Sequence, residues 1–284
     1  MAARMQRSSP SILVLAALLG ACSGGSGGDA PFVPAADPQA GAGKPVGTDA
    51  PIVPDAPPVT GTPPGSILDD PDAPAFDPDS LTARYRITLE NLWNAQDYPQ
   101  EFPDDAHLSL VGGALHDADV EFWAFGKPVT AGMDDLAETG RIDLLLYDEV
   151  VPAIEAGNAS ATIEYREYTG PMVDGVPGTS TFDIEANAVW PLLTLATMLG
   201  PSPDWFVGVS GLALDGADGW QERIVVDLPL LDGGTRSDIV PSMFGPAIDP
   251  PDPVGYVAYD PATGTYLPSV EPAMLARLTV ERVR

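Results

Sequence analysis

The chain has 284 residues, with 13 Lys and Arg against 41 Asp and Glu, so its formal net charge is −28 at pH 7. Such an acidic chain repels the phosphates of nucleic acids and anionic lipid surfaces, and we expect no nucleic-acid partner. Its single cysteine, Cys22, cannot form a disulfide within the chain. The folded part must therefore be stabilised by burial of a core.

The N-terminal pattern predicts a bacterial lipoprotein signal peptide over residues 1–21. Arg4 and Arg7 precede an apolar run at residues 12–19, which is shorter than the roughly 20 residues that span a bilayer. Small residues lead up to Cys22, whose thiol would carry lipid after cleavage. An ordinary signal peptide with an incidental cysteine is the alternative. Because Ser23 follows the cysteine, we expect an outer-membrane protein, lipid-anchored on a face that the sequence does not give.

Residues 22–79 have the composition of a disordered linker. The segment opens with Gly and Ser and then holds 13 prolines between Pro31 and Pro78. It cannot bury enough apolar surface to offset the entropy of ordering. We expect it to hold a folded domain, residues 80–284, away from the membrane.

The domain that follows reads as short strands separated by Gly, Pro and Asp. Apolar and polar residues alternate with a period of two, as in half-buried strands. The strand candidates are residues 84–90, 106–111, 120–125, 161–168, 181–186, 223–228 and 276–283. Residues 132–140 predict a short helix, and the apolar residues 190–199 are either a central strand or a buried helix. The pattern predicts an all-β fold, an antiparallel β-sandwich.

Several motifs resemble, in order, those of the spondin N-terminal domain family. The stretch 201–208 (PSPDWFVG) resembles the signature of that family most closely. The other matches are residues 85–93 (YRITLENLW), 112–116 (GGALH), 122–126 (FWAFG), 132–140, Trp220 and 232–235 (DGGT). The resemblance implies an eight-stranded, C2-like sandwich and a binding module of the extracellular matrix without enzymatic activity.

The resemblance also implies a calcium site at one end of the sandwich. Its first two ligands carry over to Asp204 and Asp232, whereas the third family position holds Arg236, which cannot ligate a cation. Three interpretations stay open. Asp238 replaces the third carboxylate, or Arg236 places its guanidinium between the two aspartates, or the aspartates only cap turns.

The sequence therefore predicts a cell-envelope lipoprotein that displays a binding or adhesion module for a protein or glycan. A structural envelope protein without a dissociable ligand is the main alternative. An envelope hydrolase is the other, because residues 208–212 (GVSGL) resemble a nucleophile elbow, but the second glycine comes one residue early. The two histidines, His107 and His116, do not form a helical zinc pair, and we expect no enzyme.

Overall fold

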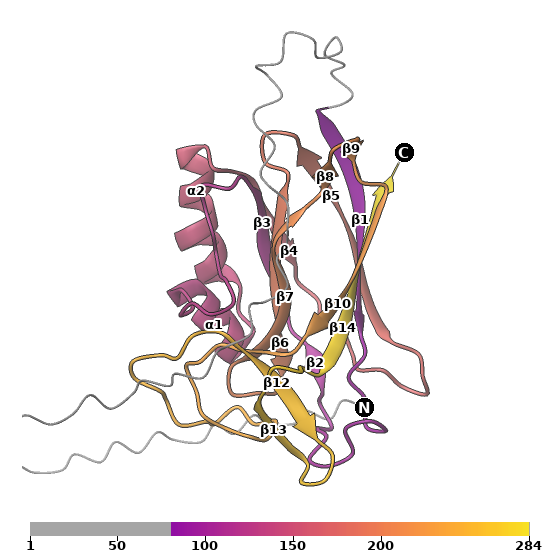
Figure 1. Cartoon of the computed structure of the whole chain (residues 1–284), viewed down its shortest axis with the longest axis vertical. Coiled ribbons are helices and arrows are strands. Elements are labelled where there is room, and N and C mark those ends of the chain that lie inside the picture. Colours follow the sequence, from indigo (N-terminus) through magenta and orange to yellow (C-terminus); the bar gives the residue numbers. More distant parts are fainter. Residues whose placement is uncertain (1–80, 284) are drawn as a thin grey trace, which may run out of the picture. The chain divides into compact units, whose positions relative to one another are not determined.

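The computed structural model describes residues 81–283, and within them two antiparallel sheets pack face to face (Figure 1). The predicted signal peptide, Cys22 and the predicted linker lie outside the described residues. The smaller sheet has the strand order β10-β14-β1-β5, and the larger one β13-β12-β11-β7-β6-β3-β4, with β2 paired to β6. The smaller sheet is formed by β1 (Thr82–Asn91), β5 (Gly178–Asn187), β10 (Arg223–Pro229) and β14 (Met274–Val283).

The larger sheet holds eight strands, some of them only two residues long. They are β2 (His107–Leu108), β3 (Val111–His116), β4 (Ala159–Tyr165), β6 (Leu192–Gly200), β7 (Trp205–Ala213), β11 (Leu231–Asp232), β12 (Gly255–Asp260) and β13 (Thr265–Pro268). A separate hairpin joins β8 (Asp215–Gly216) to β9 (Gly219–Trp220). The predicted all-β sandwich is confirmed, but with more than eight strands, because short strands extend the larger sheet.

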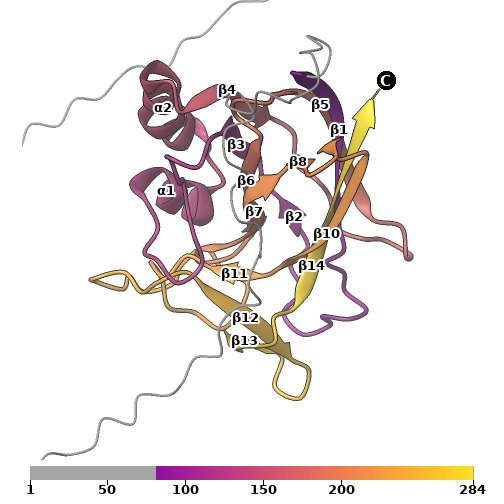
Figure 2. The same ribbon diagram turned by 45° about the horizontal axis from the view of Figure 1, so that its top comes forward.

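A helical layer covers the outer face of the larger sheet (Figure 2). It consists of α1 (Ala131–Thr139), a π-helical turn η3 (Leu145–Val150) and α2 (Val151–Ala156). The predicted helix at residues 132–140 is α1, and Gly140 ends it in the left-handed conformation, at φ 71°. The second helical segment, η3 with α2, was not predicted.

Two cores follow from these layers. The first lies between the sheets and includes Tyr85, Ile87, Leu195 and Leu278, all at most 1% exposed. The second lies between the larger sheet and the helices. Strand β6 is buried on both faces, which explains why its sequence is apolar almost throughout and gives no period. The structure thus decides residues 190–199 in favour of a central strand.

The prediction of a strand at residues 120–125 is wrong. This segment is an irregular connection between β3 and α1. Its apolar residues Phe122 and Trp123 are 3% and 7% exposed, and they pack in the helix-side core. These residues are apolar because they are buried in this core, and not because they lie in a paired strand. Residues 112–116, matched to the family by their motif, belong to the fully buried strand β3, and Gly113 there packs against the main chain of Thr194.

Candidate cation site at the end of the sandwich

Strand pairing brings Asp204 and Asp232 together. Asp204 directly precedes β7, and Asp232 ends β11; the two strands are antiparallel neighbours in which Asp232 lies opposite Trp205. The Gly233 N–H donates to the Asp204 carbonyl over 3.0 Å. Trp205, 1% exposed, fixes the start of β7 in the core, so the adjacent Asp204 is fully buried.

The turn before Asp204 is held by a serine. The Ser202 hydroxyl accepts from the Trp205 N–H over 3.0 Å and donates to the Trp205 carbonyl over 3.3 Å. This local pattern competes with regular pairing and closes the turn between β6 and β7. The signature residues 201–205 therefore serve to place one carboxylate.

The glycines after Asp232 let the chain fold back onto Asp204. Gly234 has φ 75° and lies against the Asp252 main chain, where no side chain would fit. The next two amides, of Thr235 and Arg236, both donate to Asp204 Oδ2, over 2.7 and 2.9 Å. The Thr235 hydroxyl adds a third bond over 3.2 Å. Asp204 thereby holds the start of the segment that follows β11.

The other carboxylate oxygen of Asp204 has a different environment. Asp204 Oδ1 is buried and has no hydrogen-bond partner among the described residues. Burial raises the pKa of Asp204 to about 7, and the negative charge of Asp232 adds to this effect. Hydrogen bonds from the amides of Arg236 and Thr235 act in the opposite direction. Burial also raises the pKa of Asp232, whose Oδ1 accepts from the Gly234 N–H over 2.7 Å. A buried carboxylate pair with an unpartnered oxygen is the donor chemistry that suits a hard cation.

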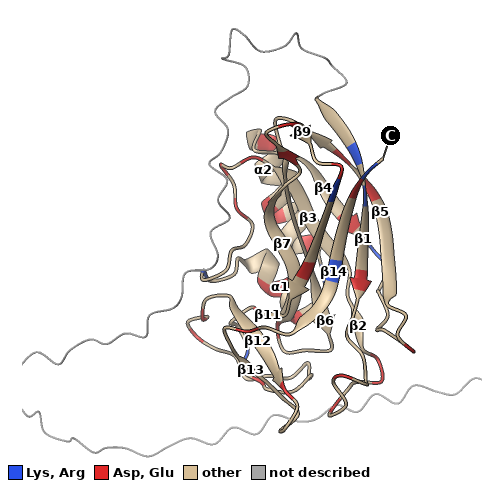
Figure 3. Cartoon of the chain, turned by 45° about the vertical axis from the view of Figure 1, so that its right-hand side comes forward, with Lys and Arg blue, Asp and Glu red and all other residues tan. Residues whose placement is uncertain are grey.

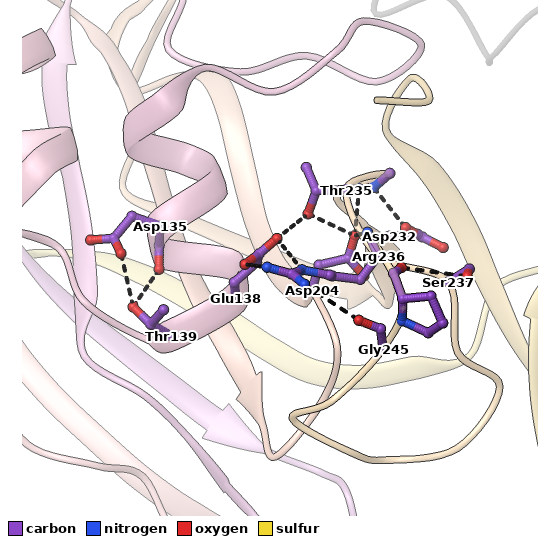
Figure 4. Close-up of polar contacts among 11 residues, drawn as sticks. Asp135, Glu138, Thr139, Asp204, Asp232, Thr235, Arg236, Ser237 and Gly245 are labelled. Atoms are coloured by element: carbon purple, nitrogen blue, oxygen red, sulfur yellow. Dashed lines mark hydrogen bonds and ion pairs between the residues drawn. The ribbon is translucent and has the colours of Figure 1, made fainter. Parts of the chain in front are cut away.

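Arg236 does not lie between the two aspartates. Its guanidinium pairs with Glu138 on α1 through two bonds, Nε to Oε1 over 2.6 Å and Nη2 to Oε2 over 2.7 Å (Figure 4). This arginine lowers the pKa of Glu138. Only the main chain of Arg236 contacts Asp204. The geometry thus differs from the built-in cation expected as one alternative.

Asp238 is not brought to the pair either. Its Oδ1 accepts from the amides of Ile239 and Val240, over 2.7 and 3.4 Å, so it caps the turn in which it lies. Within residues 81–283 no three His, Cys, Asp or Glu side chains are grouped so that they could hold a metal ion. The described site therefore offers two carboxylates, Asp204 and Asp232, and a cation there would need main-chain oxygens and water as further ligands.

Two acidic residues of α1 belong to the same network. Glu138 also accepts from the Thr235 hydroxyl over 2.9 Å, so Thr235 joins the helix to the aspartate site. Asp134, one turn before, has a buried Oδ1 without a partner among the described residues, and burial and the charge of Glu138 raise its pKa. Neither residue was predicted from the sequence as a site residue, although both lie in the matched segment 132–140.

Comparison with known proteins agrees with this geometry. The Spondin_N family matches residues 83–256, which is more than half of the chain. The chain belongs to the spondin N-terminal domain family. It is 30% identical to human spondin-2 over 210 residues, which are 71% of this chain and 62% of that protein. It is 31% identical to chicken spondin-1 over 166 residues, 56% of this chain and 20% of that protein.

The family assignment gives Arg236 its significance. At position 236, where the resemblance implies a third carboxylate ligand, this chain has an arginine that pairs with Glu138 of α1. The matched stretch covers less than two thirds of the relatives' length, so whatever the whole relatives do comes to this chain only as a proposal. None of the helices in the described part of the chain is long and apolar enough to cross a bilayer.

Proposed function

We propose that this chain is a bacterial outer-membrane lipoprotein that displays a spondin-type domain as a non-enzymatic binding or adhesion module for a protein or glycan. The observation that carries the proposal is the family match over residues 83–256, together with a carboxylate pair at one end of the sandwich. The lipid at Cys22 and the linker of residues 22–79 would present this end to a partner.

The hydrogen bonds of Ser210 and His116, the two residues that a hydrolase could use, favour the non-enzymatic proposal. Ser210, the serine of the elbow-like motif, donates to the Trp123 carbonyl. His116 bonds the Thr194 hydroxyl over 2.7 Å and the Asp117 carbonyl over 2.7 Å. Both side chains bond to partners of their own, and within residues 81–283 no hydrogen bond joins Ser210 to His116. A nucleophile needs a base within hydrogen-bond reach.

The lipid anchor is tested by changing Cys22→Ser and separating soluble, inner-membrane and outer-membrane fractions. We expect the wild type in the outer membrane and the variant unprocessed or soluble in the periplasm. A variant that still fractionates with the outer membrane would contradict the anchor. Wild type in the inner membrane would contradict only the sorting inferred from Ser23.

We further propose that the module binds calcium through Asp204 and Asp232. The support is the unpartnered, buried Asp204 Oδ1 beside a second carboxylate. Isothermal titration of the purified protein with calcium measures this directly, and Asp204→Asn is the control that keeps the shape of the side chain. Heat of binding in the wild type that is lost in the variant supports the site, whereas equal signals in both would place the calcium elsewhere.

A further inference from the structure

The segment after the aspartate site forms a closed loop with a regular stem. Arg236 pairs with Ala247 in an isolated bridge, the Ser237 N–H donates to the Pro246 carbonyl over 2.8 Å, and the Ile248 N–H donates to the Thr235 carbonyl over 2.8 Å. We call residues 238–245, at the tip of this stem, the apolar loop. Asp204, through its bonds to the amides of Thr235 and Arg236, fixes the base of the stem.

The apolar loop exposes large side chains although its own backbone is held. Phe244 is 91% exposed, Ile239 47% and Met243 44%. Asp238 caps the turn at Ile239, and the Phe244 N–H donates to the Ser242 hydroxyl over 3.3 Å. An ordered loop that keeps a phenylalanine in water gains nothing for the fold from that side chain. Exposed apolar groups gathered in one place indicate an interaction site.

The surface beside the loop is hollow. An open depression of about 610 Å³ lies there, and the residues that line it are Glu138, Thr139, Pro203, Arg236, Met243, Phe244 and Gly245. The loop also adjoins the sheet, since the Tyr266 N–H of β13 donates to the Ile239 carbonyl over 2.8 Å. The next residue of β13, Leu267, is a further exposed apolar residue, 42% exposed.

The segment that contains the loop carries charges of one sign. Between Ser237 and Ala276 the chain has no Lys, Arg or His, but it has five acidic residues, Asp238, Asp249, Asp252, Asp260 and Glu271. Five of the nine basic residues in 81–283 lie instead on the four-stranded sheet, on β1, β10 and β14 (Figure 3). The only base at the hollow, Arg236, is already neutralised by Glu138.

These charges indicate which kind of partner could bind to the apolar loop and the hollow beside it. An anionic membrane would be repelled, and so would a second copy presenting the same acidic loop. The chain's own residues 22–80 hold nine acids and one lysine, so they do not complement it either. We propose that the apolar loop and its hollow dock a basic, amphipathic segment of another protein, with Phe244 as the central anchor. This inference rests on the proposed binding function and gives that function its site and the chemistry of its partner.

The proposal is tested by titrating the full chain carrying Cys22→Ser with an 18-residue peptide of Leu and Lys, patterned as an amphipathic helix. A peptide of the same composition in scrambled order serves as the charge control. We expect the patterned peptide to bind more tightly than the scrambled one, and Phe244→Ser to weaken its binding by about 10-fold or more, because the variant no longer buries an aromatic side chain against the peptide. Phe244→Ser should melt as the wild type does, since the side chain is exposed.

The matched control is Tyr147→Ser, which removes another aromatic side chain, 60% exposed, from η3. It should leave the affinity for the patterned peptide unchanged. Equal binding of both peptides, or equal losses in the two variants, would overturn the proposal. Phe244-dependent binding to phosphatidylcholine vesicles, with or without phosphatidylglycerol, in place of the peptide would overturn it in favour of a membrane surface. Failure here leaves the fractionation and calcium results unaffected, so the two proposals fail separately.

Discussion

At the scale of single residues, Asp204 organises the loop end of the domain. One of its oxygens accepts three hydrogen bonds from Thr235 and Arg236, and the other has no partner among the described residues. An asparagine at this position keeps the accepting oxygen and offers its NH₂ group to Asp232. The buried charge next to Asp232 is thereby removed.

We therefore expect Asp204→Asn to stabilise the calcium-free protein at pH 8. A gain of about 1 kcal/mol corresponds to about 2–4 °C in melting temperature for a domain of this size. Thermal melting in a chelator measures it, with Asp238→Asn as the control, because Asp238 only caps its own turn. A lower melting temperature for Asp204→Asn would show that the ionised pair is stabilising as it stands.

Arg236 occupies the position at which the family resemblance implies a third carboxylate. Arg236→Asp removes the partner of Glu138 and adds a carboxylate near Asp204 and Asp232. We expect a lower melting temperature without calcium, because like charges then gather, and tighter calcium binding. Arg236→Gln, which removes the ion pair without adding a ligand, should lower the melting temperature but not tighten calcium binding. Equal calcium affinities for both variants would exclude position 236 from the site.

His116 gives the domain a pH dependence of its own. Burial lowers its pKa below the ordinary value, and its two ring nitrogens bond Asp117 and Thr194. The unfolded chain then binds the proton more readily, so stability from this group is present above about pH 6.5 and is lost as the pH falls further. Melting between pH 8 and pH 5 should show a larger loss for the wild type than for His116→Gln. Identical losses would contradict this role.

The site could be predicted from the sequence only in part. The resemblance named Asp204 and Asp232, and the pairing of β7 with β11 explains why residues so far apart meet. It could not place Arg236, since the choice between a metal-facing and a helix-facing guanidinium depends on α1, which is nearly 100 residues earlier. Whether Asp238 turned inward depended on the local turn, which gave it backbone amides as nearer partners.

At the scale of elements, α1 joins the site to the core. Its N-cap Thr130 accepts from the Met133 N–H over 3.2 Å and donates to Glu149 over 2.8 Å, while Glu149 also accepts from the Gly132 N–H over 2.6 Å. These bonds join α1 to η3, the next helical element along the chain. Glu138, at the other end of α1, then reaches Arg236 from a defined position.

Removing this cap should therefore destabilise the domain. We expect Thr130→Ala to cost about 1–2 kcal/mol, because both the helix amide and Glu149 lose a partner. Thr130→Ser keeps the hydroxyl and should stay close to the wild type in denaturant unfolding. A Thr130→Ala variant as stable as Thr130→Ser would show that water replaces the hydroxyl without loss.

The longer strands with one solvated face could be predicted, whereas the short strands β12 and β13 and the strands buried on both faces could not. The alternation over β1, β5, β10 and β14 gave all four members of the smaller sheet. In the larger sheet, covered by the other sheet and by the helices, β3 and β7 lack a clean period of two. The helical segment η3–α2 was not predicted, because its apolar residues form no pattern in the sequence that separates them from the neighbouring loop.

At the scale of the whole molecule, two hydrophobic cores lie within residues 81–283. We therefore expect a chain beginning at Asp79 to fold and melt as the longer chain does. Limited proteolysis should cut mainly before Leu81, and the resistant fragment can be identified by its mass. A melting temperature several degrees lower for the shorter chain would mean that the preceding residues pack on the domain.

We propose that a cation at Asp204 and Asp232 stabilises this end of the sandwich, and with it the stem that presents the apolar loop to a partner. The most direct measurement is the melting temperature of the wild-type protein with calcium and with a chelator. We predict a higher midpoint with calcium, because only a ligand that binds the folded state raises it. The same midpoint under both conditions, in the wild type and in Arg236→Asp, would contradict the claim.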